Sequence, residues 1–242
     1  MNPPIKSRLN YAWEPLADGV WRCRLPFLDV TVALVTGGDS ALLIDCGTTL
    51  LEAEAIGADV GAISGAAPDR LVLTHHHFDH VLGGGAFPDA RIHAAAPVAV
   101  ALTAGLQDLR RHALSYGARA EDVDAAIAAA RPPDDILTHT TIDLGERRVI
   151  VEHPGRGHTD HDLVVVVPAH GPGRPAVVFC GDLVEQSADP AVDADSDLSA
   201  WPRTLDRLLD LGGEDAIYVP GHGAVVDAAF VRRQRDWLAR RA

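Results

Sequence analysis

The sequence predicts an α/β protein in which strands and helices pack in layers. Short apolar runs, each about the length of one strand, recur along the chain, and helix-length segments separate several of them. Two strand-rich parts also flank an alanine-rich helical stretch at about 97–131. A chain of 242 residues can bury a substantial core, so we expect one domain over 1–242 with two similar halves.

The first strand-rich part begins as a meander and continues with alternating elements. Turn residues separate its first three apolar runs, which favours antiparallel neighbours. The strands expected here are 20–25, 31–36, 41–45, 70–73 and 90–94, with a helix at 49–64 between the third and the fourth.

The alanine-rich stretch is expected to form two helices, 98–116 and 120–130, that break near Gly117. Glu121 and Asp122 favour the start of the second helix, because acidic side chains stabilise a helix N-terminus. Strands follow at 141–144, 148–152, 163–168, 176–180 and 216–219, and helices at 199–211 and 227–240.

Charge and composition exclude several classes of partner. The net charge of −13 would repel nucleic acid and anionic membranes, and no apolar run approaches the length of a membrane span, so we expect neither as a partner. Cys23, Cys46 and Cys180 are far apart and odd in number, which favours buried free thiols in a reducing compartment. Because residues 1–4 open no apolar signal segment, we expect a cytoplasmic location.

The segment 74–85 reads THHHFDHVLGGG and follows the strand at 70–73 directly. In an extended segment alternate side chains share a face, so His75 and His77 should point to one side and His76 away. Two such imidazoles suit a divalent cation such as zinc, and Asp79 with His80 adds an oxygen and a nitrogen. Surface or helix-capping groups would explain one of these residues alone, but hardly all of them together.

Three later segments repeat the order of strand, Gly or Pro, and then a potential ligand. His158 lies in HPGRGHTDHD, Asp182 in VVFCGDL and His222 in YVPGHG, each past an apolar strand. Functional groups collect in loops at strand ends, so we expect these residues to approach the histidine segment.

HHHFDH and these later residues together resemble the His-x-His-x-Asp-His motif and the remaining ligands of the metallo-β-lactamase-fold hydrolases. The resemblance covers nearly the whole chain. It implies a four-layer αββα sandwich, with the helical stretch as an insertion between the halves and a dinuclear metal site in the groove between them. The implied ions are two divalent metals, in the first place zinc, with iron or manganese as alternatives.

The same resemblance implies a role for each matching residue. One metal would be held by His75, His77 and His158, the other by Asp79, His80 and His222, with Asp182 bridging them. Asp45, in LLIDCG, matches a family aspartate that could orient a ligand imidazole, although a strand-ending turn explains it equally well. The histidines expected not to bind metal are His76, His93, His139, His153, His161 and His170, of which His161 lies nearest to His158.

Two such ions can share a water and lower its pKa to about 7. The resulting metal-bound hydroxide could cleave a carbonyl ester, thioester, lactone or amide without a serine or cysteine nucleophile. Asp79 is the expected catalytic side chain, because it could orient the hydroxide or move its proton. Tyr218 is a candidate oxyanion donor, but packing in the core is the favoured interpretation.

The substrate is a small molecule whose identity stays open. THHHFDHVLGG is most similar to glyoxalase II, a glutathione thioesterase, yet Lys6 is the only lysine, so the lysines that grip glutathione there have no counterpart. A shorter thioesterase or a lactonase fits equally well. A β-lactamase is less favoured, because those enzymes generally carry Cys or Ser where Asp182 stands. In the helical stretch Leu102, Leu106, Leu109 and Leu114 could line an apolar pocket or pack in the core.

Two alternatives belong to other classes. One is a mononuclear iron oxidoreductase resembling the persulfide dioxygenases, which share the fold and the first histidines. The other is a binding protein with structural metals, which the His and Asp ligand set disfavours because structural zinc sites are usually closed and rich in cysteine. The sequence leaves the oligomeric state open.

Overall fold

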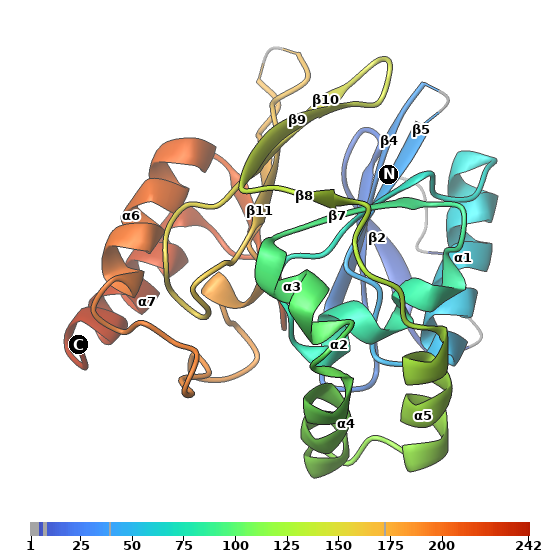
Figure 1. Ribbon diagram of the computed structural model, residues 1–242. Helices are drawn as coiled ribbons and strands as arrows, with labels where there is room; N and C mark the ends of the chain where they lie inside the picture. Colours follow the sequence, from blue (N-terminus) through green and yellow to red (C-terminus); the bar gives the residue numbers. More distant parts are fainter. Residues whose placement is uncertain (1–4, 7–8, 39, 172) are drawn as a thin grey trace.

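The central strands are apolar along most of their length, so both of their faces can be buried, and they form two sheets. The structure is a computed structural model that describes residues 5–6, 9–38, 40–171 and 173–242. Residues 1–4, on which the expected lack of a signal segment rests, lie outside this range. In the described chain the two sheets lie face to face, with α6 and α7 on one outer side and α1 on the other (Figure 1).

The first sheet joins an antiparallel meander to parallel strands. Its order over the described residues is β1-β2-β3-β4-β5-β6-β7-β8, antiparallel up to β5 and parallel from β5 to β8. The strands are β1 (Ile5–Lys6), β2 (Ala12–Ala17), β3 (Val20–Arg24), β4 (Thr31–Gly37), β5 (Ser40–Ile44), β6 (Arg70–Val72), β7 (Arg91–Ala94) and β8 (Asp135–Ile136). The meander was expected, whereas β1, β2 and β8 were not.

The second sheet has the order β13-β12-β11-β10-β9 in the described part of the chain, and only its β12–β13 pair is parallel. Its strands are β9 (His139–Asp143), β10 (Arg148–Glu152), β11 (Val164–Val167), β12 (Val177–Phe179) and β13 (Ile217–Val219). All five lie within one or two residues of the expected strands.

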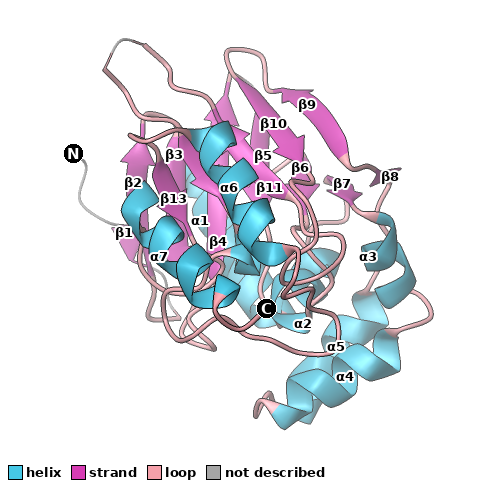
Figure 2. Ribbon diagram, turned by 90° about the vertical axis from the view of Figure 1, so that its left-hand side faces the viewer, coloured by secondary structure: helices cyan, strands magenta, loops and turns pink. Residues whose placement is uncertain are grey.

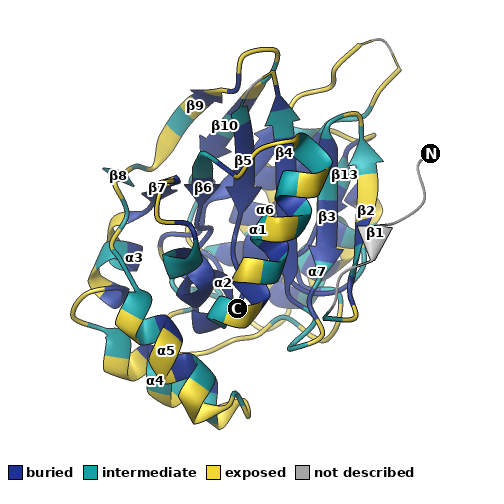
Figure 3. Cartoon of the chain, turned by 90° about the vertical axis from the view of Figure 1, so that its right-hand side faces the viewer, coloured by how far each residue is buried: buried dark blue, intermediate teal, exposed yellow. Residues whose placement is uncertain are grey.

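The core follows from the period of two in a strand. In β4, Ala33 and Val35 pack between the sheets, whereas Val32 and Leu34 face the helices of the first sheet. In β11, Val165 and Val167 likewise join the central cluster, and the alternate valines join the cluster under α6 and α7. The four-layer αββα sandwich is thereby confirmed, and its central strands, among them β4, β5 and β11, are its most buried part (Figure 3).

Helices close both outer faces. The first sheet is covered by α1 (Leu50–Ser64) together with α2 (Phe78–Val81) and the 3-10 helix Leu82–Ala86, and the second by α6 (Trp201–Gly212) and α7 (Ala228–Ala239), which lie in front in Figure 2. Two of them begin as the sequence predicts. Thr49 forms a capping box with Glu52 at the start of α1, and the Asp227 side chain accepts from the Phe230 N–H at the start of α7.

The helical stretch holds three helices where two were predicted: α3 (Ala96–Ala101), α4 (Leu106–Ser115) and α5 (Ala120–Ala129). The second break is the expected one at Gly117. The first arises because the N–H groups of Ala104 and Gly105 both return to the Val100 carbonyl and end α3 in a turn, and glycine is a poor helix former. Within the described chain, every helix is too short or too polar to cross a membrane.

Candidate metal centre

The histidine segment is fixed to both halves of the sandwich through Thr74, which follows β6. The Thr74 N–H and hydroxyl each donate to the Asp45 carboxylate at 2.8 Å, and the Thr74 carbonyl accepts from the Leu163 N–H at 2.8 Å. Asp45 ends β5 and Leu163 precedes β11 in the second sheet. The chain therefore leaves β6 in a defined direction, with His75 and His77 turned to the groove between the halves.

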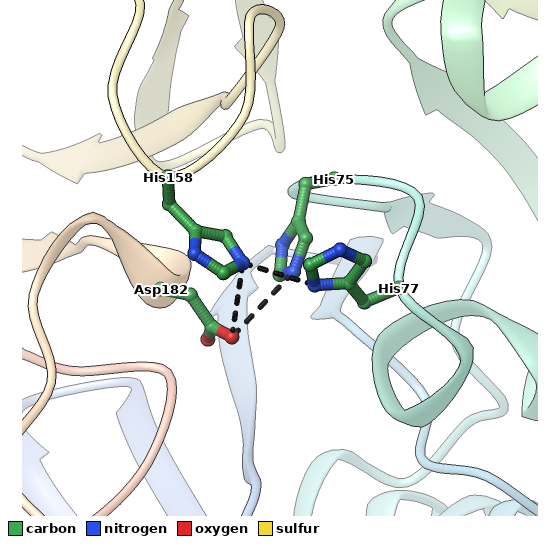
Figure 4. A group of neighbouring side chains, drawn as sticks. All are labelled: His75, His77, His158 and Asp182. Atoms are coloured by element: carbon green, nitrogen blue, oxygen red, sulfur yellow. Dashed lines mark hydrogen bonds and ion pairs between the residues drawn. The ribbon is translucent and has the colours of Figure 1, made fainter. Parts of the chain in front are cut away.

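The first group of potential ligands is His75, His77, His158 and Asp182, whose ligand atoms all lie within 4.8 Å of one another. His158 Nε2 lies 2.9 Å from His77 Nδ1, and one oxygen of Asp182, Oδ2, lies 3.6 Å from His75 Nε2 and 3.5 Å from His158 Nε2. Figure 4 shows the four side chains converging, His75 and His77 from the first half and His158 and Asp182 from the second.

The second group is Asp79, His80 and His222. Asp79 and His80 lie on α2, while His222 follows β13. His222 Nε2 lies 3.4 Å from both Asp79 Oδ2 and His80 Nε2.

Asp182 lies between the two groups. His80 Nε2 is 3.2 Å from its Oδ1, and His222 Nε2 is 3.3 Å from its Oδ2. Gly221 permits this position, because a Cβ there would come within 1.8 Å of Asp182 Oδ1.

Outer hydrogen bonds turn these imidazoles inward. The Nδ1 atoms of His80, His158 and His222 lie 2.8, 3.2 and 2.8 Å from oxygens of Asp45, Ala191 and Leu28. A carboxylate or a carbonyl oxygen can only accept, so each Nδ1 carries a proton, and in the neutral form of each imidazole Nε2 offers its lone pair. This is the outer arrangement that metal-binding histidines usually have.

Burial and charge act in opposite directions on the cluster. Burial lowers the pKa of His75 and His77 well below the usual value, which favours neutral imidazoles. Burial also acts to lower the pKa of His80 and His222, but the carboxylates of Asp182 and Asp79 outweigh it and raise the pKa of His222 to about 10. Burial raises the pKa of Asp182, and His222, His80 and His75 reverse this and hold it well below the usual value.

The residues fit divalent metal ions. His75 Nε2 is buried and has no hydrogen-bond partner among the described atoms, and such an orphaned nitrogen is costly without a ligand. Imidazole and carboxylate are the donors that zinc and related ions bind. The predicted site residues thus lie together in one buried cluster.

The structure contradicts the suggested role of Tyr218, and it limits the leucines that could line a pocket to one of four. Tyr218 is fully buried and its hydroxyl donates to the Gly213 carbonyl at 2.8 Å, so the suggested oxyanion role is wrong and the core interpretation is confirmed. Burial raises the pKa of Tyr218 to about 12. Of the four leucines in the helical stretch only Leu109 lines a described cavity, and Leu102, Leu106 and Leu114 pack in or against the core.

Other histidines lie around the cluster. His76 Nδ1 lies 3.1 Å from His161 Nε2, and His76 also belongs to another, more exposed potential metal group with His77 and Asp195. His139 and His93 instead pair with Glu152 and Asp135.

Four residues at the site were not anticipated from the sequence: His112, Glu185, Asp193 and Asp195. His112 of α4 packs edge-on against His77 at 5.7 Å between ring centroids. Its place on the same helix face as Leu109 and Tyr116 was the available signal, whereas the three acidic residues stand in loops that show no period.

Comparisons with known proteins agree with this fold. The family model of the metallo-beta-lactamase superfamily matches residues 25–222, most of the described sandwich. The chain therefore belongs to the metallo-beta-lactamase superfamily.

Among curated relatives, a metallo-beta-lactamase type 2 of Bacillus cereus is 26% identical over 170 residues, which cover 69% of this chain and 57% of that protein. One of Bacteroides fragilis is 27% identical over 123 residues, 49% of this chain and 47% of that protein. The chain thus spans about half the length of these relatives.

Solved structures match more of the chain at lower identity. A metallo-beta-lactamase from Erythrobacter litoralis has a TM-score of 0.72 at 18% identity and covers 98% of this chain and 100% of its own. One from Pontibacter korlensis has a TM-score of 0.71 at 22% identity, over 95% and 99% of the two chains. At these identities the likeness establishes the fold.

Proposed function

We propose that this protein is a hydrolase that holds two divalent metal ions, in the first place zinc, and cleaves a carbonyl ester, thioester, lactone or amide of a small molecule. The observation that carries the proposal is the convergence of two His and Asp groups on the shared carboxylate of Asp182. Membership in the metallo-beta-lactamase superfamily supports a metal-dependent hydrolase.

The proposed ligands of one ion are His75, His77 and His158, and of the other Asp79, His80 and His222, with Asp182 shared. The inward Nε2 atoms of His75, His80, His158 and His222 support this assignment, as does the 2.9 Å approach of His158 Nε2 to His77 Nδ1. Two ions bound here would supply Lewis acidity and lower the pKa of water to near neutrality.

Side chains of the protein would orient the water, form the cavity wall and hold the ligands in place. Asp79 lines the cavity of about 250 Å³ above the cluster, where its carboxylate can orient a water and accept its proton. Phe78, Leu28 and Ala188 line the same cavity and make part of its wall apolar. Asp45 holds His80 in place from behind through the 2.8 Å hydrogen bond to Nδ1.

The decisive experiment measures metal content by elemental mass spectrometry and hydrolysis of p-nitrophenyl esters on the same sample, purified without a His tag. We expect near two equivalents of zinc. His77→Ala and Asp182→Ala should each lose about one equivalent or more and lower kcat/KM on the order of 100-fold or more. His139→Ala is the matched control, because this exposed imidazole pairs with Glu152 outside the cluster.

Two results would oppose the proposal. Unchanged stoichiometry in either alanine variant would remove that residue from the ligand set. One equivalent of iron, with oxygen consumption on thiol or persulfide substrates, would replace the hydrolase by an oxidoreductase.

A further inference from the structure

A larger cavity adjoins the metal cluster. Its volume is about 680 Å³, and its wall is formed mainly by α3, α4 and the histidine segment. His77 and His112 line both this cavity and the smaller one next to the cluster, so the two cavities are adjacent. A substrate whose carbonyl reaches the cluster can therefore place another part of itself here.

The side of this cavity formed by α3 and α4 is apolar. It consists of Ala96, Pro97, Val100, Ala101 and Leu109. Val100 is 61% exposed and presents apolar surface to this cavity. An apolar wall with a few polar groups at its edge is typical of small-molecule sites.

The charged groups around both cavities are acidic. None of the described residues that line them is a lysine or an arginine. Four carboxylates outside the proposed ligand set face these spaces: Asp108, Glu185, Asp193 and Asp195. Asp108 is paired with Arg111 on the same helix, but the other three have no arginine or lysine partner among the ion pairs of the described chain.

This charge pattern selects against anions. A carboxylate on the substrate would enter a space with several negative groups and no fixed cation beyond the metals, and like charges brought together in a partly desolvated site are costly. An uncharged apolar group carries no such penalty and gains from contact with Val100 and its neighbours.

We propose that the substrate carries an uncharged apolar acyl or aryl group, bound against α3 and α4, and no free carboxylate. This inference rests on the proposed hydrolase. It favours neutral esters, thioesters and lactones over β-lactam antibiotics and glutathione thioesters, both of which carry carboxylates. The reaction consumes one water: its oxygen forms the new bond to the carbonyl carbon, the C–O or C–S bond breaks, and a proton passes to the leaving group.

Binding can be tested without catalysis, on the metal-loaded protein, with two fluorescent probes of the same skeleton. N-phenyl-1-naphthylamine is neutral, and 1-anilinonaphthalene-8-sulfonate adds an anionic group. We expect the neutral probe to bind at least about 10-fold more tightly, and Val100→Asp to weaken it by about 10-fold or more. Leu51→Asp is the matched control, an apolar helix residue that is 59% exposed on α1 and lines neither cavity.

The second test of this inference measures ester hydrolysis. p-Nitrophenyl hexanoate should be cleaved with a kcat/KM at least about 10-fold above that of the p-nitrophenyl monoester of adipate, which has the same chain with a terminal carboxylate. Val100→Asp should raise KM for the hexanoate, whereas Leu51→Asp should leave kcat and KM for both esters near the wild-type values.

The outcomes separate the two proposals. Equal binding of both probes, or an unaffected Val100→Asp variant, overturns the substrate inference even when esters are hydrolysed. If the metal-loaded protein hydrolyses no ester, thioester, lactone or amide, the hydrolase fails, and the probes still decide whether the cavity prefers neutral ligands.

Discussion

Asp45 fits both interpretations that the sequence left open, a residue of a strand-ending turn and a residue that orients a ligand imidazole. It ends β5 with a backbone φ of 57°, as a turn residue does, and its carboxylate also accepts from Thr74 and from His80 Nδ1. Asp and Asn are the non-glycine residues that adopt this conformation most readily. The turn conformation of Asp45 therefore places its carboxylate beside Nδ1 of His80, a proposed metal ligand, so the same residue forms the turn and orients the imidazole.

Replacing Asp45 by Asn tests the carboxylate without straining the turn. An amide offers only one oxygen for the three donors that Asp45 now accepts from, so His80 should lose its fixed orientation. We expect the affinity for the more weakly bound zinc to fall about 10- to 100-fold, measured by competition with a chromophoric chelator. Asp69→Asn is the control, because Asp69 also accepts from a backbone N–H, that of Ala41, away from the cluster. Equal affinities in all three proteins would leave Asp45 a turn residue only.

The sequence predicts those site residues that belong to a motif or follow a strand end, and misses those in long loops. The seven proposed ligands were identified because they follow strand ends in a recognisable order, and all seven lie in the cluster. Asp193 and Asp195 could not be found in this way. They approach His77 and His76 through the path of the long segment after β12, and no period of two or 3.6 encodes that path.

At the scale of elements, two glycines at the end of the histidine segment, Gly83 and Gly84, differ in how closely other atoms approach them. The 3-10 helix Leu82–Ala86 lies against the chain after β5, where the Gly83 N–H donates to the Gly47 carbonyl at 3.0 Å. A Cβ on Gly83 would come within 2.1 Å of the Cys46 carbonyl oxygen, whereas a Cβ on Gly84 would meet its nearest atoms at 3.9 Å. Only the first is a close backbone approach.

Gly83→Ala should therefore lower the free energy of unfolding by about 2 kcal/mol or more, because the backbone of residue 46 must move. It should also weaken metal binding, since the Cys46 N–H donates to the His80 carbonyl at 3.1 Å. Gly84→Ala, one residue along the same helix, should stay within about 1 kcal/mol of wild type. Urea unfolding of the three proteins measures this difference, and similar midpoints would show that the contact with Cys46 relaxes freely.

Elements were predicted well where burial is two-sided and poorly near the two ends of the first sheet. β4 and β11 are apolar along their length because both faces are covered. β2 contains Glu14 and Pro15, which hide its strand character, and β8 is only two residues long. β8 is the last strand of the first sheet and β2 lies next to its first strand, so both are specified by their neighbours rather than by their own sequence.

At the scale of the molecule, the proposed ligands connect the two halves. His75, His77, Asp79 and His80 belong to the first half, and His158, Asp182 and His222 to the second. Ions bound by both should hold the two sheets together, and a ligand that binds only the folded state raises its stability. Removal of metal should therefore lower Tm.

The size of that decrease should depend on pH. Without metal, His222 has a pKa of about 10, because Asp182 and Asp79 outweigh the effect of burial, and the pKa of His80 is raised for the same reason. Protonated His222 therefore contributes stability to the metal-free protein below the unfolded pKa of about 6.5, and this contribution is lost as pH rises through about 10. Metal must displace these protons, so its apparent affinity rises with pH.

We accordingly expect the gain in Tm from zinc, at a fixed buffered free concentration, to be larger at pH 9 than at pH 6, by on the order of 10 °C. Calorimetric scans with and without chelator measure it. His139→Ala should keep the wild-type dependence, because its imidazole lies outside the cluster. A gain in Tm that is constant or larger at pH 6 would mean that His80 and His222 are already neutral in the metal-free protein, and the coupling of their charge to Asp182 would have to be abandoned.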